Sequence, residues 1–322
     1  MNIAITGGTG FLGRYIVNHL LGAGHRCRCW YRPESDRGGF TNKAALTWVR
    51  GELQQSDSIA ELLDGVDAVV HGGLYRPAWG SGHRGADMYV AHFAEVNIIG
   101  SLRLIEAAHR RGVQRFVFIS SCGVHDRILD DRPLDETHPL WPLSHYGAHK
   151  AAIEKFVHSF GLPQHVDPNA TPTHRHLRPR EVWAICSLRP VGIYGVRRPL
   201  DRSKWHDVVR DVLQHQPIDD PSGGKEVHAE DVARAIDLLL HAEPHTIAGQ
   251  SYNCCDLYVS AQDVARMAKN LCSSSSKISE TNHGPRNMVE TAKLQTLGMR
   301  FGGHQILKRY VRKLAEGINE RR

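Results

Sequence analysis

The stretch Met1-Asn-Ile-Ala-Ile-Thr-Gly-Gly-Thr-Gly-Phe-Leu-Gly13 decides the fold of this chain. Residues 3–5 form an apolar run without polar alternation, which is typical of a strand buried on both faces. The pattern then changes to that of an amphipathic helix over Phe11–Leu21. The sequence therefore predicts a strand, a glycine turn and the N-terminus of a helix.

The three glycines of this stretch each suit one step of such a turn. Gly7 allows a tight turn with an unusual φ, Gly10 allows close approach to a pyrophosphate, and Gly13 allows the helix to pack on the strand. The helix N-terminus at Phe11 and Leu12 adds N–H groups and a dipole that favour an anion. Glycine turns also occur in plain loops, but a strand and a helix flank this one. We therefore expect a dinucleotide site here.

The composition indicates an ordinary globular protein. A chain of 322 residues can hold one large α/β domain, or one such domain with a smaller appended lobe. Its hydrophobic content of 41% and charged content of 23% are typical of soluble proteins, and no apolar stretch reaches the roughly 20 residues needed to span a membrane. Because Ile3 already starts a core strand, we expect no signal peptide, a cytoplasmic protein and no membrane partner.

The charge balance does not favour a nucleic-acid partner. Lysine and arginine outnumber the acids 40 to 34, which is a modest excess for this length. No basic block interleaved with aromatics occurs before Lys308–Lys313, and that tail is better explained as a solvated helical face. Phosphate-bearing ligands account for a mild basic excess equally well.

The cysteines and histidines show no disulfide or metal spacing. The seven cysteines are typical of reduced, mostly buried small residues. The 21 histidines are scattered in patches such as His174-Arg-His176, and none forms a two-histidine metal box on a helix. We therefore expect no metal.

Arg32 follows the second predicted strand, Gly24–Tyr31. In dinucleotide folds an acid at this edge binds the ribose 2′-OH, whereas an arginine accommodates a 2′-phosphate. No acid occurs before Glu34, so the sequence favours NADP(H), with NAD(H) as the other cofactor and with Arg37 or Lys43 as a further phosphate contact. The alternative is an exposed arginine without such a role.

Two further strand ends supply cofactor candidates. A third strand is expected over Leu46–Arg50 and a fourth over Asp67–His71. Ligands in open α/β sheets bind beyond the carboxyl ends of the strands, and glycines there let a ligand lie against the backbone. The candidates at these two ends are Glu52, Leu53, Gly72 and Gly73.

Strands and helices alternate along the rest of the chain. This alternation predicts an α/β fold with a doubly wound parallel sheet of the Rossmann type. The other expected elements are a helix over residues 90–110, strands over 115–119 and 182–188, a helix over 261–271 and a C-terminal helix from about 303.

Two connections carry specific expectations. We expect Ser56 or Asp57 to cap the helix after Glu52, because both residue types accept hydrogen bonds from helix N–H groups. We expect Ser273–Ser276 to be a flexible connection.

Tyr146 and Lys150 lie four residues apart at the start of a predicted helix and share one face. A tyrosine with its usual pKa of about 10 is a poor acid or base at neutral pH, but an adjacent ammonium stabilises the phenolate and lowers the pKa. Ser121 ends the fifth strand and could hydrogen-bond the same substrate oxygen during hydride transfer. Such a pair alone is usually a surface pair; the glycine turn and the serine make catalysis the better interpretation.

Seven motifs give the chain a resemblance to a known family. It resembles the extended short-chain dehydrogenase/reductases, the superfamily of NAD-dependent epimerases and dehydratases, over nearly its whole length. The matching motifs are Thr6-Gly-Gly-Thr-Gly-Phe-Leu-Gly13, Asp67-Ala-Val-Val-His71, Val96-Asn-Ile-Ile-Gly100, Ile119-Ser-Ser121, Tyr146-x-x-x-Lys150, Arg189-Pro-Val-Gly-Ile-Tyr-Gly195 and His228-x-x-Asp-Val-Ala233.

The resemblance implies roles for specific residues. Ser121, Tyr146 and Lys150 would form the catalytic triad, and Lys150 would also bind the nicotinamide ribose. Pro190 and Val191 would flank the nicotinamide. A homodimer is also implied. It would pair the helix over residues 90–110 and the helix that begins near Tyr146 with their counterparts in the second copy, and both helices show apolar faces.

Three departures from the family pattern bear on the substrate. Family dehydratases follow the serine or threonine position with an acidic pair, but this chain has Cys122-Gly123, so dehydration is not expected. Sugar-nucleotide members usually carry Asn where this chain has Gly192, and Arg where it has Lys225. Their substrate lobe is usually longer than Val196–Lys225, so a nucleoside-diphosphate sugar is not favoured.

The chain is expected to form a Rossmann domain from residues 1–195 and 226–255 and a small substrate-binding lobe from residues 196–225 and 256–322. Residues 163–180 form a His- and Pro-rich insertion where the family has a short loop. A lid, a contact surface and disorder are the alternatives for it.

The sequence thus predicts a cytoplasmic, NADP(H)-preferring oxidoreductase that acts on a small carbonyl or alcohol, with Tyr146 as general acid/base. One alternative is an epimerase that oxidises and re-reduces one sugar carbon, for which the same three residues suffice. Another is a catalytically silent NADP(H)-binding regulator, which would need neither Tyr146 nor Lys150.

Overall fold

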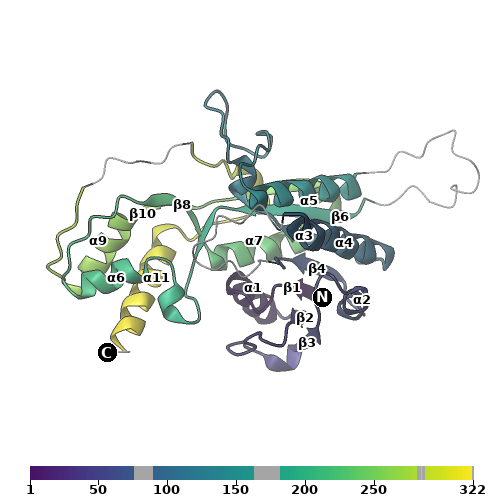
Figure 1. Cartoon of the computed structure of the whole chain (residues 1–322), viewed down its shortest axis with the longest axis horizontal. Helices are drawn as coiled ribbons and strands as arrows, with labels where there is room; N and C mark the ends of the chain where they lie inside the picture. Colours follow the sequence, from purple (N-terminus) through teal and green to yellow (C-terminus); the bar gives the residue numbers. More distant parts are fainter. Residues whose placement is uncertain (76–89, 163–181, 281–283, 285–286, 321–322) are drawn as a thin grey trace, which may run out of the picture. The chain divides into compact units, whose positions relative to one another are not determined.

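The computed structural model describes residues 1–75, 90–162, 182–280, 284 and 287–320, which group into two compact units (Figure 1). Unit 1 takes its residues from the ranges 1–127, 139–189 and 235–252, and unit 2 from 128–138, 190–234 and 253–322. The predicted insertion at 163–180 lies outside the described residues. The domain boundaries expected from the sequence remain a prediction.

Unit 1 is built on a seven-stranded sheet with the order β3-β2-β1-β4-β5-β6-β9. The strands are β1 (Asn2–Thr6), β2 (Arg26–Tyr31), β3 (Leu46–Arg50), β4 (Ala68–His71), β5 (Arg115–Ile119), β6 (Ala184–Pro190) and β9 (Gln250–Cys254). Neighbouring strands from β3 to β6 pair in parallel. This is the strand order of a Rossmann fold, so the predicted fold class is confirmed.

Both faces of this sheet are covered by helices. Ala4 of β1 belongs to a buried core shared with α2 (Ser56–Leu62), α4 (Gly100–Arg110) and α5 (His145–Gly161). Ile3 and Ile5 point to the opposite face, because successive side chains of a strand alternate, and they are fully buried too.

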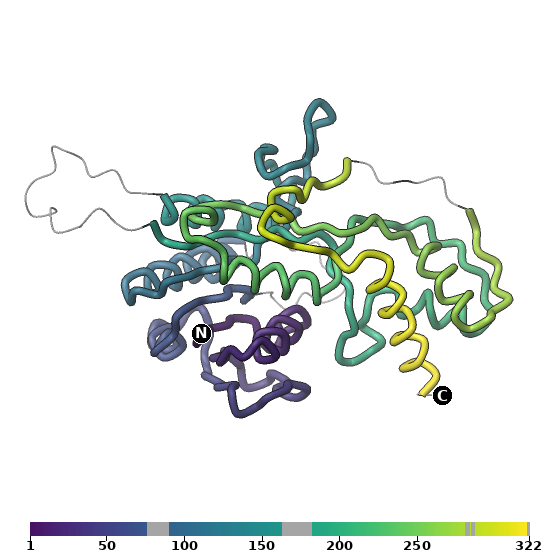
Figure 2. The backbone as a smooth tube through the Cα atoms, turned by 180° about the vertical axis from the view of Figure 1, so that it is seen from behind, coloured from purple at the N-terminus to yellow at the C-terminus, as the bar shows by residue number. Residues whose placement is uncertain are grey.

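Two helices from distant parts of the sequence lie side by side in unit 1. They are α1 (Phe11–Gly22) and the C-terminal half of α7 (Ala229–His241), whose backbones run next to each other in Figure 2. An ion pair joins His19 of α1 to Asp237 of α7. The sheet of unit 1 thus has helices on both faces, as the alternation of strands and helices predicted.

The helix predicted over residues 90–110 is interrupted. It consists of α3 (Val90–Ala94), a π-helical turn over Glu95–Ile99, and α4. Apolar periodicity could not reveal this change, because a single wider turn shifts the pattern by only one residue.

The predicted cap of α2 is wrong. The helix already begins at Ser56, and its N-cap residue is Gln55. Ser58 Oγ lies 2.8 Å from Gln55 O and accepts a hydrogen bond from the Glu52 N–H at 3.3 Å. The hydroxyl that closes this turn therefore belongs to Ser58 rather than to Ser56 or Asp57.

Unit 2 contains a three-stranded sheet and a separate core. The strands are β10 (Leu257–Ser260), β8 (Gly223–His228) and β7 (Gly192–Tyr194), in that order; β8 is antiparallel to β10 and parallel to β7. Helices α6 (His206–Leu213), α9 (Ala261–Cys272) and α11 (Gly303–Asn319) enclose this core. Two short helices complete the chain, α8 (Pro244–Ile247) in unit 1 and α10 (Ala292–Thr296) in unit 2.

The expectation of a flexible connection at Ser273–Ser276 is wrong. Ser274 and Ser276 are buried, and their hydroxyls donate to Val212 O at 2.6 and 3.2 Å. Val212 lies at the end of α6, where helix carbonyls lack intrahelical partners. The serines are therefore fixed because they satisfy that helix end.

No helix among the described residues is both long and apolar enough to cross a membrane.

Candidate active site

The glycine turn after β1 packs directly against the turn after β4. Gly7 has a φ of +76°, and a Cβ added to it would lie 2.8 Å from Gly72 O. A Cβ on Gly13 would lie 2.1 Å from Gly7 O, so α1 can approach the turn only because this residue is glycine. Gly7 and Gly13 thus have the turn and packing roles that the sequence predicted.

Gly10 occupies the N-cap of α1. A Cβ on Gly10 would meet only Gly7 O, at 3.2 Å, among the described atoms within 4 Å. The Gly10 side of the turn therefore has room that the Gly7 and Gly13 sides lack. This open backbone at the start of α1, with Phe11 and Leu12 as its first residues, fits the pyrophosphate of a dinucleotide.

A chain of buried hydrogen bonds supports this turn. The Gly73 N–H donates to Thr6 Oγ1 at 2.9 Å, Thr6 Oγ1 lies 2.6 Å from His71 Nδ1, and His71 Nε2 lies 2.8 Å from Ser101 Oγ. Burial, followed by the nearby charge of Lys150, lowers the pKa of His71 to about 3. His71 is therefore neutral and joins the ends of β1 and β4 to helix α4.

Asn97, in the π-helical turn, continues this arrangement. Its side chain accepts from the Tyr75 N–H at 2.8 Å and donates to Tyr75 O at 3.1 Å, and Ser101 Oγ donates to Asn97 O. Asn97 thus fixes the chain that leaves the turn after β4. Sequence reasoning noted it only as part of a motif, although an Asn within an apolar helical pattern was a usable signal.

Ser121 and Tyr146 come together because the turn after β5 packs on the N-terminus of α5. Ser121 caps a short 3₁₀ turn, Cys122–His125, by accepting from the Gly123 N–H at 3.1 Å. A Cβ on Gly147 would lie 2.4 Å from Gly123 O, so only glycine permits this contact. A Cβ on Gly123 would lie 3.4 Å from Ser121 Oγ and 3.9 Å from Tyr146 Cδ1.

Lys150 is buried near the Tyr146 ring and the end of β5. Its Nζ donates to Ile119 O at 2.7 Å and lies 4.6 Å from the Phe118 ring centroid and 6.0 Å from the Tyr146 ring centroid. Burial and the charge of Lys150 lower the pKa of His149 to about 3, so its ring stays neutral beside Tyr146, with centroids 5.3 Å apart. The structure thus gathers Ser121, Tyr146 and Lys150 at one place.

A buried ion pair holds the elements that carry these side chains. Arg189, near the end of β6, donates to Glu154 of α5 through Nε at 3.0 Å and Nη2 at 2.6 Å. Its Nη1 also lies 3.3 Å from His125 Nε2, in the 3₁₀ turn. Such bidentate pairs fix geometry. Sequence reasoning missed Glu154, although it follows Lys150 by one further helical turn.

Arg32 is the first residue after β2, in a loop that contacts the glycine turn. Its N–H donates to Ser35 Oγ at 3.0 Å, and Thr9 Oγ1 donates to the same Ser35 Oγ at 3.5 Å. The Arg32 side chain is exposed and pairs with Glu34 at 2.9 Å. The loop after β2 therefore borders the start of α1.

Arg14 of α1 is a residue that sequence reasoning missed. Its guanidinium donates to Asp36 O at 2.6 Å, pairs with the Asp36 carboxylate at 3.0 Å and donates to Gly38 O, so it fixes this loop. Arg37 stacks over the Tyr31 ring at 4.4 Å, while Lys43 is exposed in the 3₁₀ turn Lys43–Ala45.

Four other predicted cofactor residues have distinct surroundings. Leu53 is buried, and a Cβ on Gly100 would lie 2.8 Å from its Cβ, so Leu53 packs against α4; Glu52 is exposed. Pro190 ends β6, and the Val191 N–H donates to Cys254 O at 3.1 Å; both belong to unit 2.

Gly192, where sugar-nucleotide members usually carry Asn, faces a buried acid. A Cβ on Gly192 would lie 2.6 Å from Glu226 Oε2. Burial raises the pKa of Glu226, and the ion pair with Lys204 opposes that rise. In this chain, the Glu226 carboxylate fills the space beside residue 192.

Comparison with known proteins gives consistent results. The profile of the NAD dependent epimerase/dehydratase family matches residues 3–255. A 3-beta-hydroxysteroid dehydrogenase of Mycolicibacterium neoaurum is 29% identical over 215 residues, which are 66% of this chain and 52% of that protein. An uncharacterised UDP-glucose epimerase of Bacillus subtilis (strain 168) is 27% identical over 274 residues, covering 79% of this chain and 76% of that protein.

A crystal structure of the Thermus thermophilus UDP-glucose 4-epimerase in complex with NAD has the same fold. It is 21% identical, with a TM-score of 0.70, and the alignment covers 98% of this chain and 99% of that one. The matched part of the chain spans about half the length of the steroid dehydrogenase.

Proposed function

We propose that this chain, which belongs to the NAD dependent epimerase/dehydratase family, transfers hydride between a nicotinamide cofactor and a small carbonyl or alcohol substrate. The observation that carries the proposal is the grouping of Ser121, Tyr146 and the buried Lys150 ammonium at the carboxyl end of β5. Ligands of open α/β sheets bind at that edge.

The three side chains divide the proton chemistry between them. Tyr146 gives a proton to the substrate oxygen during reduction and takes it back during oxidation. The Lys150 ammonium stabilises the phenolate of Tyr146 in the deprotonated stage. The Ser121 hydroxyl hydrogen-bonds the same substrate oxygen and holds it in line with Tyr146. A bound nicotinamide would supply or accept the hydride.

We propose NADP(H) as the preferred cofactor. Two guanidinium groups, those of Arg32 and Arg37, lie in the loop after β2. Of the two acids in this loop, the exposed Glu34 pairs with Arg32, and Asp36 pairs with Arg14. A phosphate can replace Glu34 as the partner of Arg32, because both groups are exposed. The glycine turn would hold the pyrophosphate, with Lys150 at the nicotinamide ribose and with Pro190 and Val191 flanking the ring.

An epimerase acting on a sugar or sugar nucleotide is the second candidate. It is supported by the relative and the solved structure that carry epimerase names. The space beside Gly192 counts against it, because an Asn side chain there would have to displace the buried Glu226 carboxylate, which pairs with Lys204. A silent NADP(H)-binding regulator is the third candidate, and the buried Lys150 beside Tyr146 counts against it, because such a protein needs neither residue.

A substrate screen tests the proposal. Wild-type protein and Tyr146→Phe are incubated with small aldehydes, ketones, alcohols and sugar nucleotides, and the NADPH absorbance is followed. We expect turnover of a carbonyl compound by the wild type, and a loss of about 10²-fold or more in Tyr146→Phe, because the ring remains but the ionisable oxygen is gone. Cofactor binding, followed by fluorescence titration, should remain.

The outcomes separate the candidates. A change of sugar stereochemistry without net cofactor turnover would identify an epimerase. If a substrate is found and Tyr146→Phe turns it over at the wild-type rate, the mechanism is wrong although the fold stands.

The cytoplasmic location remains a prediction from the sequence. We also propose that the chain forms a homodimer. Ile99 of the π-helical turn is 41% exposed and Phe156 of α5 is 36% exposed, so both elements present apolar side chains that a second copy could cover. A monomer mass by light scattering at micromolar concentration would contradict the dimer.

A further inference from the structure

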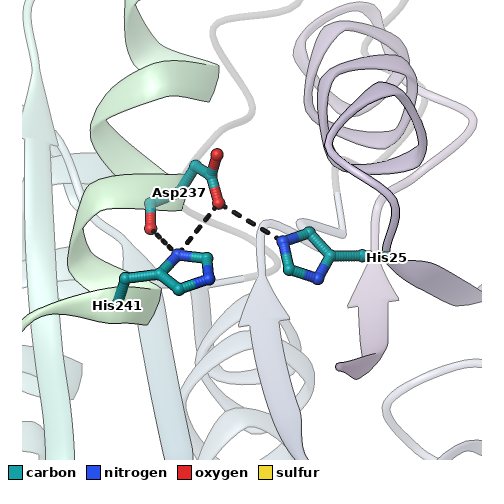
Figure 3. Close-up of side chains that lie close together, drawn as sticks. All are labelled: His25, Asp237 and His241. Carbon is teal, nitrogen blue, oxygen red and sulfur yellow. Dashed lines mark hydrogen bonds and ion pairs between the residues drawn. The ribbon is translucent and has the colours of Figure 1, made fainter.

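A group of histidines around one carboxylate lies in unit 1. Asp237 is on the last turns of α7, His241 follows it by one helical turn, and His25 lies directly before β2 (Figure 3). One ligand atom from each of the three side chains lies within 4.8 Å of the others. Figure 3 shows the Asp237 carboxylate between the two imidazole rings, with a dashed line to each.

The two distances from the Asp237 carboxylate to the imidazole nitrogens are close to those of a metal site, and the two nitrogens lie within 4.8 Å of each other. Asp237 Oδ1 lies 3.5 Å from His25 Nε2 and 3.2 Å from His241 Nδ1. Two donors bound to one tetrahedral zinc ion, each about 2.0–2.2 Å from it, lie roughly 3.3–3.5 Å apart. We propose that His25, Asp237 and His241 bind one divalent transition-metal ion of the zinc class, with the fourth position open to water.

The chemistry of the donors supports this class of ion. Two imidazole nitrogens and a carboxylate oxygen suit zinc, cobalt and nickel rather than calcium or magnesium, which prefer oxygen ligands. Burial, followed by the charge of the N-terminal amino group, lowers the pKa of His25. Its ring is therefore neutral near pH 7, and the neutral form is the one that binds metals.

Proton positions can adjust to such an ion. His241 Nδ1 donates to Asp237 O at 2.8 Å, so coordination moves that proton to Nε2, on a side chain that is 56% exposed. For His25, the Met1 ammonium donates to Nδ1 at 3.2 Å, so the ring proton lies on Nε2. Coordination through Nε2 moves that proton to Nδ1 and requires the Met1 amino group to be neutral or to turn away.

His19 supports the carboxylate from its other side. Its Nε2 lies 3.0 Å from Asp237 Oδ2, whereas the proposed ligand atom is Oδ1. A hydrogen bond from outside the ligand set commonly orients a ligating carboxylate. His19 therefore acts as a positioning residue and leaves Oδ1 directed toward His25 and His241.

The position of the group indicates a structural ion. His25 precedes β2, so the group lies at the amino edge of the parallel strands, whereas Ser121 and the glycine turns follow the carboxyl ends. An ion held by His25 and α7 would connect segments more than 200 residues apart in sequence. It would therefore stabilise unit 1 without taking part in hydride transfer.

Metal binding by protein without a histidine tag tests the proposal. Equilibrium dialysis with zinc and visible absorption with cobalt are compared for wild type, His241→Ala, Asp237→Asn and the control His245→Ala. His245 is an exposed histidine four residues after His241 and outside the group. We expect one ion per chain, a tetrahedral cobalt spectrum, an affinity loss of about tenfold or more in both ligand variants, and none in the control.

Thermal unfolding with and without zinc gives an independent measurement. Zinc should raise the Tm of wild type and of His245→Ala but not that of His241→Ala, because only an ion bound to the folded state stabilises it. Equal Tm values without zinc would show that the variants fold. Less than one ion per wild-type chain in excess zinc, or unchanged affinity in either ligand variant, would overturn the site.

Discussion

The two edges of the seven-stranded sheet each carry a candidate site, and the two sites are assembled from the sequence in different ways. At the carboxyl edge, Gly7 and Gly72 directly follow β1 and β4, and Ser121 is the second residue after β5, so short segments of sequence create the site. At the amino edge, His25 meets Asp237 only because α7 lies beside α1. A site made of strand ends can be recognised from short segments of sequence. A site made by the packing of distant helices cannot.

The largest expected effect is at the carboxyl edge. Lys150→Met removes the ammonium beside Tyr146, so turnover of an identified substrate should fall by about 10²-fold or more, and cofactor affinity should fall too. Lys155→Met is the matched control, because Lys155 is an exposed lysine on the same helix. Stopped-flow turnover and fluorescence titration measure the two quantities.

Equal losses of turnover in both lysine variants would show that turnover depends on the positive charge of α5 and not on the position of Lys150. Turnover of Lys150→Met at the wild-type rate would remove Lys150 from the mechanism.

The next effect concerns the backbone of the glycine turn. Gly13→Ala places a Cβ where Gly7 O lies 2.1 Å away, so α1 must shift from the turn. We expect a loss of about 1–3 kcal/mol in the free energy of unfolding, together with weaker cofactor binding. Gly22→Ala, at the end of the same helix, meets no described heavy atom within 4 Å and should be neutral or stabilising.

Urea unfolding of both glycine variants measures this difference. A Gly13→Ala protein as stable as Gly22→Ala would mean that the close packing of the turn is unnecessary.

Much of the carboxyl edge could be predicted from the sequence. The strands that form the parallel sheet, the positive φ of Gly7 and the meeting of Tyr146 with Lys150 follow from patterns within short segments, and the family prediction is confirmed. The roles of the predicted site residues in catalysis and cofactor binding remain predictions. Their placement at strand ends and at the start of α5 is what the structure adds.

The remaining features depend on contacts between distant segments. Arg189 pairs with Glu154 and Arg14 fixes the loop after β2 only in the folded chain, and neither pair has a local sequence signal. Ser274 and Ser276 are fixed by the end of α6, about 60 residues earlier in the chain, so composition alone wrongly predicted flexibility there. The group of histidines at the amino edge could not be predicted from the sequence either, because its members are distant in the chain.

Acid should affect the carboxyl edge through its buried histidines. The pKa of His149 is about 3 in the folded protein and about 6.5 in the unfolded chain, so the unfolded state binds more protons between these values. Stability is therefore complete above pH 6.5 and falls as the pH is lowered. At pH 5 the loss from one such histidine is about 2 kcal/mol.

His149→Phe tests this contribution. His149 Nδ1 makes no hydrogen bond within the described residues, so the substitution removes the titration without breaking a bond at that nitrogen. The free energy of unfolding should fall less steeply between pH 7 and pH 5 in His149→Phe than in the wild type. Identical slopes would show that His149 titrates normally.

The smallest expected effect is a change in cofactor affinity, tested with one arginine at each end of β2. Arg32 follows the carboxyl end of β2, and Arg26 begins the same strand at the amino edge; both side chains are exposed. A charge-assisted contact is worth about 1.5–3 kcal/mol, and we expect the lower end, because Arg32 is exposed and already paired with Glu34. Arg32→Ala should therefore weaken NADP(H) binding about tenfold and leave NAD(H) unchanged, whereas Arg26→Ala should change neither affinity. Fluorescence titration of both cofactors decides the matter. A wild-type preference for NAD(H), or equal effects of the two substitutions, would mean that the charge at the end of β2 does not select the cofactor.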